Sequence, residues 1–279
     1  MAQPPSHSIP TKLSAAESTD MAKLFDTHAH YTDERLMGDT ALLSSVFAGD
    51  VSHILTVATD LADTKNCIAL AGKWDGMYAS AGIHPHETAK VENIDDAMNE
   101  LEKLLHEDKV VALGEIGLDY YYDFADRDTQ IALFRAQMDV AAKTGKPVII
   151  HDRDAHGDTM DIIREYAGRV RGILHSCSAS AEQVKEYVKF GWYISFSGVI
   201  TFKNASKVLD SVLATPLDRI LVETDCPYLA PVPMRGKTNH SGYMHFTAAK
   251  AADLLGMDYN AFCETEVKNA MDILGISQK

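Results

Sequence analysis

A helix followed by a buried strand is encoded by RDTQIALFRAQMDVAAKTGKPVIIH, residues 127–151. In the predicted helix, 127–143, apolar side chains recur with helical spacing and form one stripe: Ile131, Phe134, Met138 and Ala141. Gly145 and Pro147 stand just beyond it, in the order that is typical of a helix end. The strand that follows is a continuous apolar run, as in parallel strands that are buried on both faces. These residues therefore predict an α/β protein with a parallel sheet.

Similar apolar runs occur along the whole chain. The predicted strands are LFDTH (24–28), HILTVA (53–58), MYASAG (77–82), VVALGEI (110–116), PVIIH (147–151), RGILH (171–175), WYISFS (192–197) and RILVETD (219–225). Helical patterns lie near 95–106, 158–166, 180–189, 203–213 and 244–255, and one more, 258–273, follows the last strand. This alternation predicts a single (β/α)8 TIM-type barrel with an extra C-terminal helix. The alternative is a doubly wound open sheet, which often has a glycine-rich turn after its first strand; HAHYTDERL (28–36) contains no such turn.

Length and composition fit one globular domain. The chain has 279 residues, of which 46% are hydrophobic and 24% are charged, and α/β barrels of this size form single domains. No run of about 18 apolar residues occurs, so we expect no membrane-spanning helix. We expect residues 1–22 to form a flexible extension without a secretory signal, and residues 23–279 to form the barrel. Four cysteines without a CxxC pair predict a reducing, cytoplasmic location.

The net charge limits the kind of partner. Lys and Arg number 26 and Asp and Glu number 40, which gives a formal net charge of −14. Proteins that bind nucleic acid usually present a basic face. An acidic chain that acts on a phosphate substrate must therefore obtain positive charge locally, for example from bound metal ions.

Metal-binding side chains stand at the ends of five predicted strands. The strands of a TIM-type barrel end at the face that carries the active site, so we expect six residues to meet at one rim: His28, His30, Glu115, His151, His175 and Asp225. Each residue alone could have a structural role, but burying so many unpaired polar groups together would be costly. Imidazole and carboxylate groups bind zinc, manganese and related divalent ions. Six ligands exceed the need of one tetrahedral ion and predict two ions that share a carboxylate.

Longer motifs around these residues resemble the TatD family of metal-dependent deoxyribonucleases, within the amidohydrolase-like superfamily, from about residue 24 to residue 275. The motifs are FDTHAHYTD (25–33), AGIHPHE (81–87), ALGEIGLDYYYD (112–123), PVIIHDRDA (147–155), SGVITFK (197–203), LVETDCPYLAP (221–231) and PMRGKTN (233–239). The resemblance implies that His28, His30 and Asp225 bind one ion. It implies that Glu115 bridges two divalent ions and that His151 and His175 bind the other. The identity of the ions is left open among Mg, Zn and Mn.

Two stretches depart from the pattern of that family. HSCSA (175–179) stands where the family commonly has HCFSG, so an aromatic residue and a glycine are missing after His175. Asn239 is followed by His240 and Ser241, where the family commonly has NEP. The ligand His175 is retained, so the departures concern substrate contacts and leave the metal ligands intact.

The ligand set and the resemblance predict a metal-dependent nuclease that hydrolyses phosphodiester bonds in DNA. Asp225 is placed to accept the proton of the attacking water as general base, while Glu115 joins the two ions. Because basic residues are few, we expect action on ends or single strands, as a 3′–5′ exonuclease. Two alternatives stay open: a hydrolase that cleaves an amide, ester or lactone, and a metal-binding protein without catalysis. The oligomeric state is also open.

Five residues are expected to contact the substrate: His84, Arg153, Arg235, Lys237 and Tyr120. His84 follows the third predicted strand at the same rim. Arg235 and Lys237 belong to the RGK match and would supply positive charge. Tyr120 begins a run of three tyrosines, and aromatic rings in a rim loop can stack on nucleobases.

Three other reactive side chains near the predicted rim can be explained by structural roles: His86, Cys177 and Cys226. His86 fits either a substrate contact or a hydrogen-bonded turn beside Pro85. Cys177 and Cys226 flank ligand positions, and we expect both to pack, because a nucleophilic cysteine needs an activating base.

Overall fold

Eight parallel strands stand at the centre of the computed structural model, which describes residues 22–122 and 124–277. They are β1 (Leu24–Ala29), β2 (Val51–Thr56), β3 (Met77–Ala81), β4 (Val110–Asp119), β5 (Val148–Arg153), β6 (Gly172–Leu174), β7 (Tyr193–Phe196) and β8 (Ile220–Val222). Each strand pairs with the next one along the chain, from β1 to β8. This order belongs to a (β/α)8 barrel, because the strand order of a doubly wound sheet reverses. The predicted fold class is confirmed.

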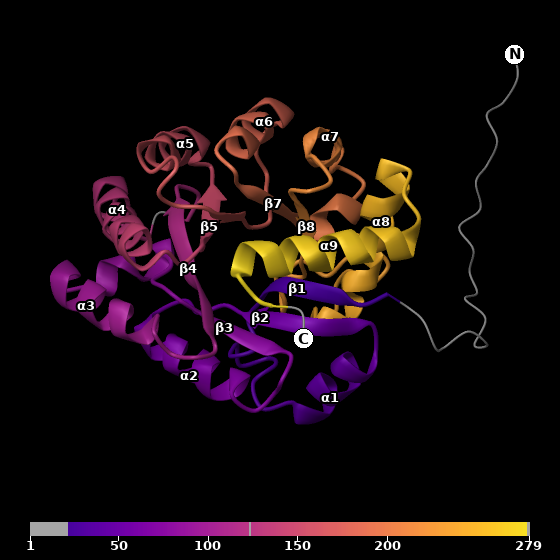
Figure 1. Cartoon of the computed structure of the whole chain (residues 1–279), viewed down its shortest axis with the longest axis horizontal. Helices are drawn as coiled ribbons and strands as arrows, with labels where there is room; N and C mark the ends of the chain where they lie inside the picture. Colours follow the sequence, from indigo (N-terminus) through magenta and orange to yellow (C-terminus); the bar gives the residue numbers. More distant parts are fainter. Residues whose placement is uncertain (1–21, 123, 278–279) are drawn as a thin grey trace, which may run out of the picture.

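Helices connect the strands and surround them (Figure 1). They are α1 (Thr40–Ala48), α2 (Leu61–Ala71), α3 (Ile94–Leu104), α4 (Arg127–Thr144), α5 (His156–Glu165), α6 (Ala181–Lys189), α7 (Ser206–Ala214), α8 (Met244–Leu255) and α9 (Tyr259–Leu274), with short 3-10 helices at η1 (Pro85–Lys90), η2 (Gly198–Thr201) and η3 (Ser241–Tyr243). The sequence pattern does not predict α1 and α2. The buried positions of α2 are Thr64, Cys67 and Ala71, and none of them carries a large apolar side chain.

Local chemistry sets both ends of α4. The side chain of Asp126 accepts a hydrogen bond from the backbone N–H of Thr129 at 2.9 Å, which caps the first turn. Gly145 ends the helix with a φ of 72°, a left-handed conformation that glycine adopts without strain. Between these caps, Phe134 and Met138 of the predicted stripe are buried in the core. The helix therefore begins and ends where its sequence signals predict.

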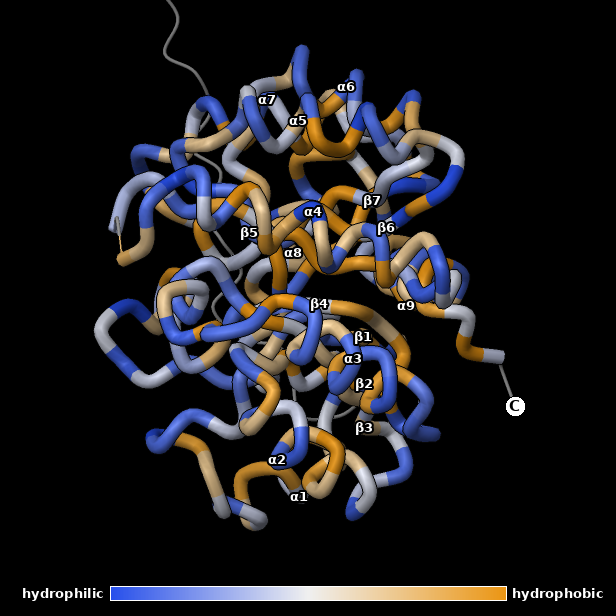
Figure 2. The backbone as a smooth tube through the Cα atoms, turned by 90° about the vertical axis from the view of Figure 1, so that its left-hand side faces the viewer, coloured by the Kyte–Doolittle hydropathy of each residue, from blue (hydrophilic) through white to orange (hydrophobic). Residues whose placement is uncertain are grey.

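The core has two parts, one inside the barrel and one between the barrel and the helices. Alternate strand residues fill the interior: Phe25, Leu55, Ala112, Ile149, Ile173 and Leu221. A larger cluster joins the outer faces of the strands to the helices. Figure 2 shows hydrophobic residues concentrated along the central strands and hydrophilic residues in the outer turns.

Helix α9 closes the end of the barrel at which the strands begin. Its last turns pack against the interior cluster. Glu266 accepts a hydrogen bond from the backbone N–H of Phe25 at 3.1 Å. The Asn269 amide donates to the carbonyl oxygens of Leu217 at 2.8 Å and Ile220 at 2.9 Å. The extra C-terminal helix thus satisfies backbone groups at the start of β1 and β8.

The barrel closes between β1 and the segment that follows β8. Ala29 and Cys226 form a parallel bridge at this seam. The backbone N–H of Asp225 donates to the carbonyl oxygen of His28 at 2.9 Å, and that of His30 donates to Cys226 at 2.7 Å. The seam therefore places Asp225 beside His28 and His30, although Asp225 is far from both in the sequence.

Three further expectations concern membrane-spanning helices, the N-terminal extension and the cysteines. Across 22–122 and 124–277, no helix combines the length and the apolar character needed to cross a membrane. The expected extension, 1–22, lies outside the described residues except for its last position. The four cysteines are all buried and free: Cys67, Cys177, Cys226 and Cys263.

Candidate active site

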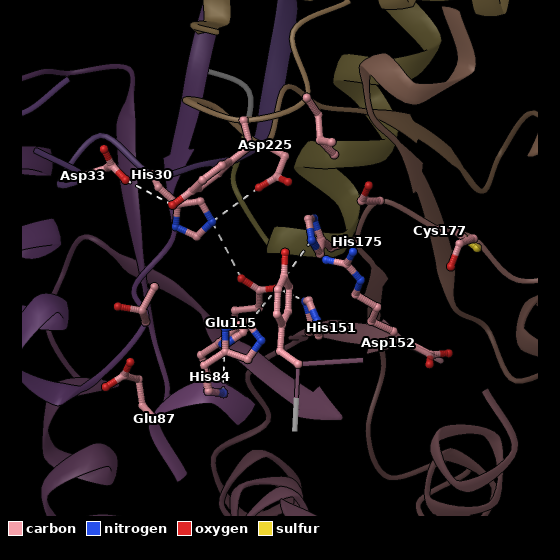
Figure 3. A pocket seen from close by; sticks show the side chains of 18 of the residues that line it. His30, Asp33, His84, Glu87, Glu115, His151, Asp152, His175, Cys177 and Asp225 are labelled. Atoms are coloured by element: carbon pink, nitrogen blue, oxygen red, sulfur yellow. Dashed lines mark hydrogen bonds and ion pairs between the residues drawn. The ribbon is translucent and has the colours of Figure 1, made fainter. Parts of the chain in front are cut away.

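A cavity of about 890 Å³ opens at the end of the barrel where the strands terminate. Five of the six predicted metal ligands line it: His30, Glu115, His151, His175 and Asp225. Figure 3 shows their side chains turned toward one another. The sixth, His28, is fully buried beneath them, and its ring stacks on that of His175 at 3.6 Å between centroids. The structure thus brings together all six residues.

Glu115 occupies the middle of this cluster, and its two carboxylate oxygens face different histidine pairs. Oε2 lies 3.3 Å from Nε2 of His28 and 3.7 Å from Nε2 of His30. Oε1 lies 2.7 Å from Nδ1 of His151 and 3.4 Å from Nε2 of His175. A carboxylate in this position is suited to contact two cations at once.

The backbone of β4 explains how Glu115 reaches the centre. The β4–β5 pairing shifts register between Leu113 and Ile116, and such a bulge redirects the side chain that it carries. Close approach of the two strands also requires a glycine. A Cβ atom at Gly117, where φ is 139°, would lie only 2.0 Å from the carbonyl oxygen of His151. The bulge and this glycine together bring the side chains of Glu115 and His151 into contact.

The second carboxylate, Asp225, faces the two histidines from β1 and its end. Its Oδ1 lies 3.5 Å from Nε2 of His30 and 4.0 Å from Nε2 of His28, and these nitrogens are 3.2 Å apart. The other ring nitrogen of His30 contacts the carbonyl oxygen of Val57 at 2.9 Å, which orients the ring. Asp225 has a φ of 54°, a costly left-handed conformation that the seam maintains.

Two carboxylates behind the cavity orient the other pair of histidines. Nδ1 of His175 contacts Oε1 of Glu223 at 2.7 Å, and Nε2 of His151 contacts Oδ2 of Asp119 at 3.0 Å. Such partners fix the tautomer of a metal-binding imidazole and raise its basicity. Sequence reasoning missed both carboxylates as functional residues. The GLD and VETD motifs contain them, but a motif does not show which carboxylate stands behind a histidine.

The electrostatics of the cluster favour positive charge. Burial raises the pKa of the Glu115 carboxyl, but the imidazoles of His84, His175 and His28 more than offset this, so its pKa lies well below the usual value. Burial lowers the pKa of His175, but the carboxylates of Glu223 and Glu115 outweigh this and raise it to about 10. A cavity that keeps its central carboxylate ionised and stabilises imidazolium groups also fits divalent cations.

Several combinations of these side chains are close enough to hold an ion. Among the described residues, four triplets place ligand atoms within 4.8 Å of one another: His28–His30–Asp225, Glu115–His151–His175, His84–His86–His151 and His28–His175–Glu223. The first two triplets correspond to the ligand sets that the resemblance implies for two ions. The other two triplets share His28, His151 and His175 with the first two.

His84 presents an N–H group to the cavity. Its Nδ1 accepts a hydrogen bond from the backbone N–H of His86 at 3.1 Å, so the proton of the neutral ring resides on Nε2. Nε2 lies 3.6 Å from Oε1 of Glu115. Burial lowers the pKa of His84 to about 4, so the ring is neutral near neutral pH. His84 is therefore a neutral hydrogen-bond donor beside the predicted metal ligands.

The structure separates the predicted substrate-binding residues into two groups. Arg153 and His84 line the cavity. Three do not: Tyr120, Arg235 and Lys237. The hydroxyl group of Tyr120 donates to Oδ2 of Asp158 at 2.6 Å, which turns the ring toward α5. The local hydrogen-bond partner thus keeps this tyrosine out of the cavity.

The RGK segment lies on the outer surface. The guanidinium group of Arg235 covers the ring of Phe202 at 4.0 Å and contacts the carbonyl oxygen of Ala230 at 3.4 Å. Lys237 is exposed, and its backbone N–H donates to Met234 at 3.1 Å within a turn. The structure therefore does not bring either basic side chain to the cavity.

Three aromatic side chains at the rim were not among the predicted site residues. They are Tyr122, Phe124 and Tyr228. The run of three tyrosines indicates an aromatic loop, but its sequence does not show which ring turns outward. Tyr121 and Tyr122 are both exposed, whereas Tyr120 is partly buried and packs against the hydrophobic core.

The two stretches that depart from the family pattern have different positions. The amide of Asn239 is buried and donates to the carbonyl oxygens of Thr224 at 2.9 Å and Tyr228 at 2.7 Å, so it supports the backbone around the β8 end. Ser176 and Cys177 line the cavity. Burial raises the pKa of the Cys177 thiol to about 12, which agrees with a packing role. The HSCSA stretch thus reaches the cavity, whereas His240 and Ser241, the residues that depart after Asn239, are not among those that line it.

Comparison with known proteins identifies relatives along nearly the whole chain. The family model described as TatD related DNase matches residues 25–275. The uncharacterized metal-dependent hydrolase YabD of Bacillus subtilis (strain 168) is 37% identical over 256 residues, which cover 91% of this chain and 100% of that protein. A protein of Enterobacter lignolyticus (strain SCF1) named 3'-5' ssDNA/RNA exonuclease TatD is 28% identical and covers 91% of this chain and 100% of its own length.

A solved structure agrees with these sequence matches. The crystal structure of YJJV, a TatD homolog from Escherichia coli K12, has a TM-score of 0.83 and 27% identity, and covers 91% of this chain and 98% of its own. Barrel, cavity and histidine–carboxylate cluster together define a metal-dependent hydrolase. The chain belongs to the TatD related DNase family. The matched residues include every predicted metal ligand.

Proposed function

We propose that this hydrolase is a nuclease that cleaves phosphodiester bonds in DNA, acting on ends or single strands with two divalent ions bound. One observation carries the proposal: the two oxygens of Glu115 face two separate histidine pairs, His28 with His30 and His151 with His175. The family match and a relative named as a 3'-5' single-strand exonuclease support the choice of substrate.

In this proposal the six ligands divide between two ions. His28, His30 and Asp225 would hold one ion, whereas His151 and His175 would hold the other. Glu115 would contact both. When bound, Mg, Zn or Mn ions supply Lewis acidity toward a phosphate and lower the pKa of water. The nitrogen-rich ligand set fits zinc by affinity, while carboxylate oxygens and cellular availability also admit magnesium and manganese.

Asp225 is the proposed proton acceptor. Burial raises the pKa of its carboxyl, but the hydrogen bond from His30 and the nearby imidazoles outweigh this and lower the pKa overall. The side chain is therefore ionised near neutral pH, and 15% of its surface is exposed at the cavity. A carboxylate that is held rigidly and stays ionised can accept a proton from water beside the phosphate.

His84 is the proposed hydrogen-bond donor to the substrate. It is neutral, and its Nε2–H group faces the same oxygen of Glu115 that contacts His151. A donor in a buried cavity stabilises negative charge that develops on a phosphate or leaving-group oxygen. Because the tautomer is fixed by the backbone of η1, the ring needs no reorganisation to donate.

Charge explains the proposed preference for ends and single strands. The chain carries a net charge of −14, and Arg153 is the one predicted basic contact that lines the cavity. Duplex clamping by many phosphate contacts is therefore disfavoured. We also infer that the protein works in a reducing compartment such as the cytoplasm, because its four cysteines are buried and unpaired.

Digestion of single-stranded oligonucleotides tests the proposal. A 5′-labelled strand with a free 3′ end, the same strand with a blocked 3′ end, and a panel of esters, lactones and lactams are each incubated with chelator, Mg, Mn or Zn. We expect metal-dependent loss of 3′ nucleotides from the free strand and slow cleavage of the blocked strand. Turnover of a lactone or lactam without cleavage of either oligonucleotide would instead favour the carbonyl hydrolase. Absence of all turnover would favour metal binding without catalysis.

A further inference from the structure

Two aromatic rings stand exposed at the rim of the cavity. Tyr122 and Phe124 lie nearly parallel, with 5.5 Å between ring centroids and 9° between planes. Both line the cavity, and they expose 46% and 59% of their surface. Flat apolar surface of this kind beside an active site is suited to bind another flat ring.

The position of this aromatic pair is fixed by the same carboxylate that orients a metal ligand. Oδ1 of Asp119 accepts a hydrogen bond from the backbone N–H of Tyr122 at 3.0 Å. Oδ2 of Asp119 contacts Nε2 of His151 at 3.0 Å and Nε2 of His86 at 2.8 Å. The loop that carries the aromatic pair is therefore tied to the predicted metal ligand through a single side chain.

His86 packs against both rings. Its ring is nearly perpendicular to each of them, with 5.2 Å between the centroids of His86 and Tyr122 and 4.9 Å between those of His86 and Phe124. The centroid of His86 lies 6.0 Å from that of His151. The aromatic pair is therefore connected to the predicted metal ligand His151 through one intervening ring.

Charge next to the aromatic pair fits an anionic chain. The guanidinium group of Arg153 lies 4.7 Å from the ring centre of Tyr122 and 4.2 Å from that of Tyr121. Arginine stays protonated at any physiological pH and can contact phosphate oxygens while it covers an aromatic face. A ligand that supplies both a flat ring and a phosphate would engage the rings and the arginine together.

We propose that Tyr122 and Phe124 form a stacking platform for a nucleobase of single-stranded nucleic acid, close to the phosphate that is cleaved. This inference rests on the proposed nuclease function for the choice of ligand. A base in a duplex is stacked and paired, so a platform of this kind selects frayed ends and single strands. Stacking does not depend on which base is present, so the platform tolerates any sequence.

A thermodynamic cycle between protein and substrate tests the platform. The double variant Tyr122→Ala/Phe124→Ala and the wild type are compared on single strands that carry either an intact base or an abasic site at each of the three 3′-terminal positions. We expect the wild-type kcat/KM to fall about 10-fold or more when the stacked base is removed, since aromatic stacking typically contributes that much. The double variant should lose a similar factor on the intact strand and show little further loss on the abasic one.

Binding without turnover provides the second readout. A phosphorothioate single strand with 2-aminopurine near its 3′ end should lose fluorescence on binding the wild type, because stacking quenches this base. The variants Phe124→Trp and Tyr122→Phe should keep the quenching, and Leu213→Ala, an exposed change on α7 outside the cavity, should behave as wild type. The double alanine variant should lose it.

The outcomes separate the platform from the nuclease function. Cleavage by the wild type with no abasic effect and no quenching would overturn the platform and leave the nuclease function standing. Quenched binding without cleavage under any metal would support the platform and contradict the nuclease function. Failure of the wild type to bind the oligonucleotide would contradict both.

Discussion

The carboxylate of Glu223 accepts a hydrogen bond from Nδ1 of His175 at 2.7 Å, directly behind the proposed metal site. The same oxygen of Glu223, Oε1, accepts a hydrogen bond from the backbone N–H of Ser176 at 2.9 Å. This arrangement leaves Nε2 of His175 facing Oε1 of Glu115. His175 is thus aimed by a residue that never reaches the cavity.

Removal of this charge should weaken metal binding. Glu223→Gln keeps the shape of the side chain and a hydrogen-bond acceptor but makes the imidazole less basic, so we expect metal affinity to fall about 10-fold or more. Competition with a chromophoric chelator measures the affinity directly. Glu186→Gln, at a half-buried position on α6 that does not line the cavity, is the control. Equal affinities in the three proteins would show that Glu223 does not support the ligand.

Asp225→Asn tests the proton acceptor. The amide keeps the size of the carboxylate and an oxygen for the metal but cannot accept the proton, so kcat should fall about 100-fold or more at saturating metal. Bound metal is measured on the same samples, and Asp210→Asn on the exposed face of α7 is the matched control. Near-normal turnover of Asp225→Asn with metal bound would remove this residue from the proton transfer.

Gly117→Ala should destabilise the fold and the site together. The new Cβ would lie 2.0 Å from the carbonyl oxygen of His151 at a φ of 139°, so β4 and β5 would have to separate. We expect the free energy of unfolding to fall by about 2 kcal/mol or more, from backbone strain and the clash together. Urea denaturation measures this loss.

Gly157→Ala is the matched control for that substitution. A Cβ at Gly157 meets nothing within 4 Å, and the residue lies in α5. Alanine is the better helix former, so the control should be neutral or more stable by up to about 1 kcal/mol. A Gly117→Ala protein as stable as this control would show that the close approach of β4 and β5 is not required.

A pH-dependent contribution is expected from Glu266 in α9. Burial raises the pKa of its carboxyl well above the usual value. The folded protein therefore binds this proton more tightly than the unfolded chain does. Its contribution to stability is fully present below the usual carboxyl pKa and is lost as the pH rises toward the folded-state pKa.

Glu266→Gln should remove this loss, because the amide keeps an oxygen for the backbone N–H of Phe25 and does not titrate. As the pH rises above the usual carboxyl pKa, the wild type should lose up to about 1.4 kcal/mol per pH unit relative to the variant. Urea denaturation across this range gives the two slopes, with the exposed Glu264→Gln of the same helix as control. Parallel slopes for wild type and Glu266→Gln would contradict the raised pKa.

The barrel and the convergence of the six candidate ligands were predictable because the strand ends of a parallel barrel meet at one face. His28 and Asp225 are far apart in sequence, yet each directly follows or ends an apolar run, and that position alone places them together. The helix α2 was not predictable in this way, because its buried positions, Thr64, Cys67 and Ala71, carry only small side chains.

The outer parts of the site depend on contacts that no local pattern contains. Tyr120 turns away because its hydroxyl group meets Asp158, a residue of another helix. Tyr122 and Phe124 reach the rim because Asp119 and His86 hold their loop. Residues that support or line the cavity therefore emerge only once the elements are placed in space.

Anomalous scattering from crystals grown with Mn or Zn tests the central claim, that two ions share Glu115, because it gives the number and the positions of the bound ions. Two peaks per chain are expected, one among His28, His30 and Asp225 and one beside His151 and His175, with Glu115 between them. In Glu115→Gln crystals at least one peak should weaken strongly. A single peak, or two peaks away from Glu115, would contradict the two-metal site.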